Sequence, residues 1–274
     1  MSIHTPAEVR HAVRNRYARA AAEPAGCCEP TCGGEGIDAA SMSRAVGYTD
    51  EQLGRLPEEA NLGLGCGNPT ALAELRAGET VLDLGSGAGI DCFLASTHVG
   101  PAGRVIGVDM TPEMIERARR SAEEGGYENV EFRLGEIEAL PVADTAVDVI
   151  LSNCVLNLTT DKARVLGEAY RALRSGGRLV VSDMVSDQEV PAAVQGSLDA
   201  VAGCLPTFRD EYLRLFTDAG FTDVEITSES PYPMSYIMED VGVREYLSDH
   251  PSVLADLEAF AGSISGAHFT ARKP

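Results

Sequence analysis

The sequence predicts an α/β fold built on a doubly wound, largely parallel sheet. Short apolar runs typical of buried strands alternate with helical stretches between residues 80 and 185. Strands that alternate with helices pair in parallel, because the chain must cross back over the sheet between them. A glycine-rich loop directly follows the first of these strands, as it does in doubly wound sheets that bind nucleotide-like ligands.

The regular core is expected to contain five strands and three helices. Each expected strand is a short run rich in Val, Ile and Leu, and these runs occupy residues 80–84, 104–109, 130–134, 147–152 and 178–183. The stretches between them carry helical patterns near residues 89–98, 112–124 and 161–174.

The chain on either side of this core follows other patterns. Residues 6–22 have apolar side chains at helical spacing, and the Gly- and Pro-rich segment that follows is expected to be a loop. Four arginines on this helix are interpreted as a solvated face: Arg10, Arg14, Arg16 and Arg19. Beyond the core, the sequence predicts helices and one strand, in order, at 189–202, 209–219, 222–227 (the strand) and 252–262.

These patterns divide the chain into three parts. Residues 1–59 form an N-terminal helix and a Cys-rich loop, residues 60–185 form the core domain, and residues 186–274 form a smaller C-terminal α+β region.

Composition excludes several kinds of partner. The formal net charge is −20, and nucleic acid needs clustered Lys and Arg, so neither nucleic acid nor an anionic membrane is expected to bind. No stretch is apolar enough over the length needed to span a bilayer, and the N-terminus has no apolar signal-peptide core. We therefore expect a cytoplasmic protein, in which the seven cysteines stay reduced unless chemistry uses them.

The loop after the first strand reads "VLDLGSGAGID" over residues 81–91. Glycines here let the backbone turn sharply and approach a ligand closely. The pattern is GxGxG, and Ile90 stands where the NAD fingerprint would require glycine. A tight structural turn would explain the glycines alone about as well. A second acid, Asp109, ends the next strand at the spacing used to hold ribose hydroxyls.

Together with "GEIEALP" after the third strand and "SN" after the fourth, these features resemble the S-adenosylmethionine-dependent class I methyltransferases over residues 60–185. In that family the glycine loop lies against the methionine part of the cofactor. The acid after the second strand holds the ribose, and the segment after the third strand flanks the adenine. The resemblance implies a cofactor-binding set of Asp83, Gly85, Ser86, Gly87, Asp109, Met110, Gly135, Glu136, Ile137 and Asn153.

The cysteines fall into two sets. Cys92 lies inside the helix after the glycine loop and is expected to be core packing. The others lie in loops or at the ends of expected elements: Cys27, Cys28, Cys32, Cys66, Cys154 and Cys204. The last three could converge beside the cofactor, because ligands in open α/β sheets bind at the carboxyl ends of the strands.

Three other interpretations of these thiols stay open. Each could be packing, the N-terminal thiols with Cys66 could hold zinc, or the Cys-rich loop could be a redox clasp without a part in substrate binding. A further interpretation is that several thiolates jointly bind a soft, thiophilic centre. Trivalent arsenic is such a centre and suits three thiolates.

Longer stretches resemble the arsenite methyltransferases over most of residues 45–225. They include "NLGLGCGNPTALAELRAGETVLDLGSGAGIDCFLA", "VIGVDMTPEMIERAR", "LSNCVLNL", and "AGC" before "EYLRLFTDAGF". The resemblance implies that Cys66, Cys154 and Cys204 handle arsenic. It also implies an N-terminal thiol that pairs with Cys66, with Cys32 preferred over Cys27 and Cys28. The "LPTF" after Cys204 departs from the family pattern.

The resemblance implies methylation of arsenite, or of its glutathione conjugate, for arsenic detoxification, with S-adenosylmethionine as cofactor and no permanent metal. Thioredoxin or glutathione would reset the redox cysteines. Trivalent arsenic already carries a lone pair, so no general base is needed, and none of the five histidines lies where a base is expected. The alternatives are a methyltransferase for a small organic acceptor with packing cysteines, and a non-enzymatic thiol protein that binds a metalloid or zinc.

Overall fold

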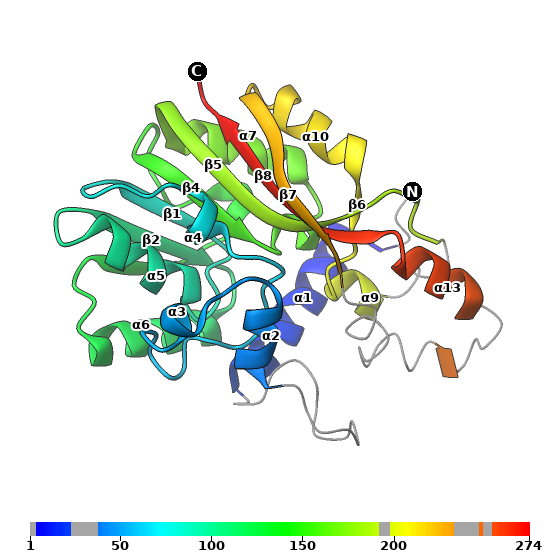
Figure 1. Ribbon diagram of the computed structural model, residues 1–274, viewed down its shortest axis with the longest axis horizontal. Coiled ribbons are helices and arrows are strands. Elements are labelled where there is room, and N and C mark those ends of the chain that lie inside the picture. The colour runs from blue at the N-terminus through cyan, green and yellow to red at the C-terminus, as the bar shows by residue number, and fades with distance from the viewer. Residues whose placement is uncertain (1–3, 23–37, 192–197, 233–246, 249–253) are drawn as a thin grey trace.

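A computed structural model describes residues 4–22, 38–191, 198–232, 247–248 and 254–274. Within these residues one mixed, eight-stranded sheet is covered by helices on both faces (Figure 1). The strands are β1 Thr80–Leu84, β2 Arg104–Asp109, β3 Val130–Leu134, β4 Val147–Asn153, β5 Leu173–Ser186, β6 Thr207–Phe208, β7 Thr222–Pro231 and β8 Ile264–Arg272.

The strand order is β3-β2-β1-β4-β5-β8-β7, with the short β6 paired to β5 off this path. Strands β1 to β5 pair in parallel, and β8 runs antiparallel between β5 and β7. The order reverses at β1, so the carboxyl ends of β1 and β4 flank the crevice where such sheets bind ligands.

Helices occupy the connections and the N-terminal segment. They are α1 Pro6–Ala22, α2 Ala39–Ala45, α3 Asp50–Leu53, α4 Pro69–Leu72, α5 Ile90–Val99, α6 Pro112–Gly125, α7 Lys162–Ala172, α9 Leu198–Ala202, α10 Arg209–Asp218 and α13 Leu254–Ala261, with 3-10 turns η1 Ile137–Ala139 and η2 Leu156–Leu158. Among the described residues, no helix is long and apolar enough to cross a membrane.

Local sequence explains where these helices begin and end. Helix α6 starts with Pro112 at its first position and stops at Gly126, whose φ of 67° lies in the left-handed region. Its buried residues recur at helical spacing: Ile115 and Ala118 pack in the core on the sheet, and Met114 packs against α1. The polar face outside carries the charged residues between them.

Two apolar cores lie on the two faces of the sheet. On one face, α7 and α10 pack against β1, β4, β5 and β8 through buried side chains such as Leu166 and Phe216. On the other face, α5 and α6 pack through side chains such as Phe93 and Ile115. Burial on both faces explains why the core strands read as continuous apolar runs.

The predicted α/β fold is confirmed. The core strands and helices lie within a few residues of their expected places, although β5 begins at Leu173 rather than at residue 178. Helix α10 and strand β7 also lie where they were expected. Of the helix expected at 189–202, residues 198–202 are helical, residues 189–191 are not, and residues 192–197 lie outside the described residues.

Strand β8 was not predicted. It joins β7 to β5, so the C-terminal strands continue the core sheet instead of forming a layer of their own (Figure 1). The division into three parts at residues 59 and 185 stays a prediction.

Candidate active site

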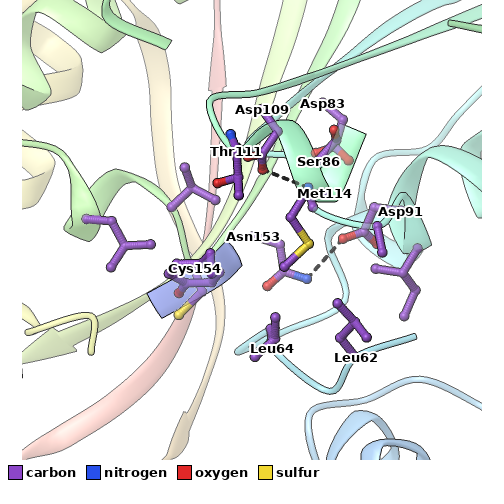
Figure 2. Close-up of a pocket in the computed structure, with 18 of the residues that line it drawn as sticks. Leu62, Leu64, Asp83, Ser86, Asp91, Asp109, Thr111, Met114, Asn153 and Cys154 are labelled. Atoms are coloured by element: carbon purple, nitrogen blue, oxygen red, sulfur yellow. Dashed lines mark hydrogen bonds between the residues drawn. The ribbon is translucent and has the colours of Figure 1, made fainter. Parts of the chain in front are cut away.

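A pocket opens along the carboxyl edge of the sheet. Its walls come from the segments that follow β3, β2, β1 and β4, from α1 and from residues 60–65. Figure 2 shows Asp109, Ser86, Asp91, Asn153 and Cys154 gathered around it. The pocket therefore crosses four neighbouring strand ends and reaches Cys154.

The glycine loop forms the floor of this pocket. Gly85 and Gly87 have φ of 65° and 52°, in the left-handed region that favours glycine. A Cβ on Gly85 would lie 2.5 Å from Cγ2 of Val155, so a side chain there would collide with the segment after β4. The loop thus brings backbone close to the space that a ligand would fill.

Ser86 gives independent evidence that this space is built for a ligand. The residue is 5% exposed, and its Oγ has no hydrogen-bond partner among the described residues. A buried hydroxyl without a partner is costly unless a ligand or water satisfies it. The residue lines the pocket, so a bound molecule can supply that partner.

Asp109 ends β2 and stands at the centre of the pocket edge. Its Oδ2 accepts from the backbone N–H of Gly87 at 2.9 Å, and its Oδ1 accepts from that of Thr111 at 2.8 Å. Burial raises the pKa of Asp109, and these two backbone donors oppose the shift. Each oxygen keeps acceptor capacity for hydroxyl groups of a ligand.

Two buried carboxyl groups, Asp83 and Asp91, line the end of the pocket near β4. Asp91 accepts from Tyr48 Oη at 2.8 Å and from Asn153 Nδ2 at 3.0 Å, the latter drawn in Figure 2. Burial raises the pKa of Asp91 to about 6, and burial together with Asp91 raises the pKa of Asp83 well above its ordinary value. This end of the pocket therefore favours a positively charged ligand group.

Nine of the ten residues expected to hold the cofactor line this pocket, and Glu136 does not. The Glu136 side chain instead lies 3.6 Å from the Arg14 guanidinium, and Glu138 is the acid that lines the pocket. Arg10 also lines the pocket, so the interpretation of all four arginines of α1 as a solvated face was wrong for that residue. The cofactor roles themselves stay predictions.

The structure brings the three expected arsenic-handling thiols together. The Sγ atoms of Cys154 and Cys204 are 3.3 Å apart, and those of Cys66 and Cys154 lie within 4.8 Å of each other and of an Asp183 oxygen. All three cysteines are buried. They come from the loop before α4, the end of β4 and the segment after α9, so only the folded chain unites them.

Two of these cysteines have an unusual backbone. Cys154 and Cys204 have φ of 59° and 70°, a region that residues with a side chain rarely adopt. Such strain persists where the surrounding structure enforces it, and it gathers at functional sites.

The thiols are protonated at neutral pH in this arrangement. Burial raises the pKa of Cys66 to about 12. The hydrogen bond with Cys154 and burial raise the pKa of Cys204. For Cys154, the bond with Cys204 lowers the pKa, but Cys66 and burial outweigh it, so the pKa is raised well above its usual value.

Asp183, which lies in the buried part of β5, was not singled out from the sequence as a site residue. Its carboxylate accepts from Asn157 Nδ2, from the backbone of Met184 and from Tyr212 Oη, at 2.8 to 2.9 Å. Burial raises its pKa to about 6. Apolar side chains complete the wall around the thiols: Met184, Phe260 and Ile264.

His268 was not assigned to this region from the sequence either. It sits on β8, where its Nδ1 lies 2.6 Å from Ser182 Oγ, and its Cε1 occupies the space that a Cβ on Gly67 would need. Strand β8, near the end of the chain, therefore packs against the loop that carries Cys66. No signal in the sequence pointed there, because β8 itself was not recognised.

The remaining cysteines divide as follows. Cys92 is fully buried in α5 and donates to Asp83 Oδ2 at 3.3 Å, which confirms it as a core residue. The predicted redox thiol, Cys32, and its alternatives Cys27 and Cys28 lie outside the described residues.

Comparison with known protein families assigns this fold and pocket to a class of enzyme. A family described as "Methyltransferase domain" matches residues 75–220, more than half of the chain. The strand order, the glycine loop and the acid after β2 agree with that match. Fold and pocket together define a class I methyltransferase.

Relatives narrow the class further. An arsenite methyltransferase from Halobacterium salinarum is 46% identical over 258 residues, which cover 88% of this chain and 65% of the relative. One from Aquipseudomonas alcaligenes is 38% identical over 202 residues, 70% of this chain and 57% of the relative. The chain thus spans less than two thirds of the length of both. The crystal structure of an arsenic(III) S-adenosylmethionine methyltransferase from Chlamydomonas reinhardtii is similar with a TM-score of 0.59 and 31% identity, over 84% of this chain and 72% of that one. The chain belongs to the arsenite methyltransferase family.

Proposed function

We propose that this protein transfers methyl groups from S-adenosylmethionine to trivalent arsenic held by Cys66, Cys154 and Cys204. One observation carries the proposal: Cys154 belongs both to the end of the cofactor pocket and to the thiol cluster. An acceptor bound by that sulfur would therefore lie beside the pocket. The names of the similar proteins support arsenite as the acceptor.

The residues of the pocket fit S-adenosylmethionine. Asp109 would hold the ribose hydroxyls, Gly135 and Ile137 would flank the adenine, and Asp91 would hold the amino group of the methionine part. When bound, the cofactor supplies an electrophilic sulfonium methyl group. The orphaned hydroxyl of Ser86 would gain a partner in the same complex.

The thiol cluster would bind and orient the arsenic. As arsenite enters, each thiol forms an As–S bond, and its proton leaves with an arsenic hydroxide as water. Placing arsenic in one position converts a bimolecular encounter into an intramolecular one. Arsenic has no proton to lose before it reacts, so the protein needs no general base at this point.

Methylation raises the formal oxidation state of arsenic, and two electrons return it to the trivalent form. An N-terminal thiol, Cys32 by preference, would lose its proton and attack the Cys66 sulfur. The As–S bond to Cys66 would then break, its electron pair would stay on arsenic, and the Cys32–Cys66 disulfide would form. Thioredoxin or glutathione would then reduce that disulfide in the cytoplasm. In this scheme the reaction serves arsenic detoxification and uses no permanent metal.

The test is incubation of the purified protein with arsenite, S-adenosylmethionine and a thiol reductant, followed by separation of the arsenic species. Wild type should yield methylated arsenic. Cys154→Ser and Cys204→Ser should yield none from arsenite or methylarsenite, whereas Cys66→Ser should still methylate methylarsenite. Cys92→Ser is the matched control, because it makes the same substitution away from the cluster, keeps a hydroxyl that can donate to Asp83 and should spare activity.

Opposite results identify the alternatives. Full activity of Cys154→Ser on arsenite would refute the ligand role of that thiol. A wild type that binds no arsenite but methylates a small organic acceptor would be the methyltransferase with packing cysteines. Stoichiometric arsenite or zinc binding without S-adenosylhomocysteine release would identify a non-enzymatic thiol protein.

A further inference from the structure

Two asparagines flank the central thiol, one residue before and three residues after Cys154. Asn153 ends β4, and Asn157 lies in η2. Each uses its side-chain amide to reach a different segment of the chain, and each of those segments carries one of the other two thiols.

Asn153 binds the Cys66 segment. Its Oδ1 accepts from the backbone N–H of Cys66 at 3.0 Å, and its Nδ2 donates to the carbonyl of Gly67 at 2.8 Å. A Cβ on Gly65 would lie 2.8 Å from the same Nδ2, so only glycine lets the loop close over this amide. The Asn153 side chain thus fixes the conformation of the loop that carries Cys66.

The orientation of the Asn153 amide is fixed from the other side. Its Nδ2 also lies 2.9 Å from Tyr48 Oη and 3.0 Å from Asp91 Oδ2. A carboxylate can only accept when ionised, so it selects the amide nitrogen and leaves the oxygen facing Cys66. The cofactor pocket and the Cys66 loop therefore share this contact.

Asn157 binds the Cys204 segment in the same manner. Its Oδ1 accepts from Thr207 Oγ1 at 2.7 Å, and its Nδ2 donates to Asp183 Oδ1 at 2.8 Å and to the Met184 carbonyl at 2.7 Å. Thr207 lies three residues after Cys204 and pairs with β5. The amide thus joins the segments of two thiols through one buried side chain.

An amide is the group that this position requires. It must give two N–H bonds and accept one, and the side chain is 6% exposed. A carboxylate would offer no donor and would stand against the Asp183 carboxylate. Leucine would fill a similar volume but would leave the buried partners of the amide unpaired.

We infer that Asn153 and Asn157 are positioning residues that hold the Cys66 and Cys204 thiols, one each, against Cys154. The left-handed backbone of Cys154 and Cys204 requires such external restraint. The consequence for methylation rests on the proposed function, whereas the placement of the thiols does not.

The test measures how fast the thiols pair under mild oxidation by diamide. Two thiols lose two hydrogens to the N=N bond, a disulfide forms, and peptide mass spectrometry identifies which pair has joined. Asn157→Leu should slow the Cys154–Cys204 bond by about tenfold or more and leave the Cys66–Cys154 rate near wild type. Asn153→Leu should do the reverse, so each variant is the control for the other.

Two further variants keep the inference falsifiable if a leucine variant fails to fold. Thr207→Val removes one bond of the Asn157 amide and should slow the Cys154–Cys204 pair alone. Tyr212→Phe removes a different bond to Asp183, leaves the amide intact and should not change the ratio of the two disulfides.

Equal slowing of both pairs by Thr207→Val, or wild-type rates in the leucine variants, would overturn the inference. A wild type that produces no methylated arsenic would overturn the proposed function instead, and the disulfide ratio would still test the positioning. Under the proposed function, Thr207→Val should lower kcat for arsenite more than it changes the KM for S-adenosylmethionine.

Discussion

Replacing Asp91 with asparagine should weaken S-adenosylmethionine binding and reduce its dependence on pH. Asp91 is buried at the pocket end near β4, beside Asp83, Tyr48 and Asn153, and burial raises its pKa to about 6. The ionised carboxylate would pair with the ammonium of the methionine part of the cofactor. A buried hydrogen bond to a charged group contributes about 1.5–3 kcal/mol, so the variant should bind about 10- to 150-fold more weakly.

The sign of the pH effect follows from the direction of the shift. A carboxyl group with a raised pKa stays protonated, and therefore neutral, until the pH passes its folded-state value of about 6. Wild-type affinity should rise between pH 5 and pH 7 and then level off. At pH 5 roughly a tenth of the Asp91 groups are ionised, so binding should be about tenfold weaker than at the plateau.

Isothermal titration calorimetry between pH 5 and pH 8 measures both effects. Adenosine is the control ligand, since it keeps the ribose and adenine but has no ammonium group, and its affinity should be unchanged by pH or by Asp91→Asn. The reasoning fails if adenosine shows the same loss at pH 5, or if wild-type S-adenosylmethionine binding is flat across the range.

Three other outcomes can be measured on the same protein. In thermal melts, Gly85→Ala should unfold at a lower temperature than Gly100→Ala. Both positions have positive φ, but only a Cβ at Gly85 would contact another side chain, at 2.5 Å. This overpacking should lower the free energy of unfolding by about 1–3 kcal/mol. In urea unfolding, Arg178→Ala should lower the free energy of unfolding by about 3–5 kcal/mol, because the side chain of its partner Glu79 is only 15% exposed and would be left unpaired. Arg55→Ala, on the surface, should lower it by less than about 1 kcal/mol. Under the proposed function, arsenite affinity should stay nearly constant from pH 6 to pH 8, because the thiols are protonated there and each proton leaves in water. A steep rise with pH in a fluorescence titration would contradict this.

The core of the fold could be predicted because its signals are local. Apolar runs bounded by glycine or proline mark β1 to β5, and the glycine loop marks the pocket edge. Strand β8 lacks such a signal, since "ISGAHFTAR" contains Gly, His, Ser and Thr among few large apolar residues. Its pairing with β5 and β7 supplies the stability that its own sequence does not indicate.

The thiols of the candidate site could be named because a resemblance singled out three cysteines, while their supports could not. Asn157 reads as an ordinary polar residue after a strand. Its role depends on Asp183 and Thr207, which lie 26 and 50 positions further along the chain. Contacts of this separation follow from the sheet topology, which a pattern of single residues does not contain.

The left-handed conformations of Cys154 and Cys204 affect how much free energy is spent on ordering the thiols during binding. Forcing two such backbones costs of order 1–3 kcal/mol each, and this cost is met when the polypeptide folds, before any arsenical arrives. Under the proposed function, an incoming arsenical would therefore find the sulfurs already juxtaposed and would lose little affinity to organising them. Mutations that relax those backbones should accordingly raise the free energy of unfolding and lower the affinity for the proposed substrate.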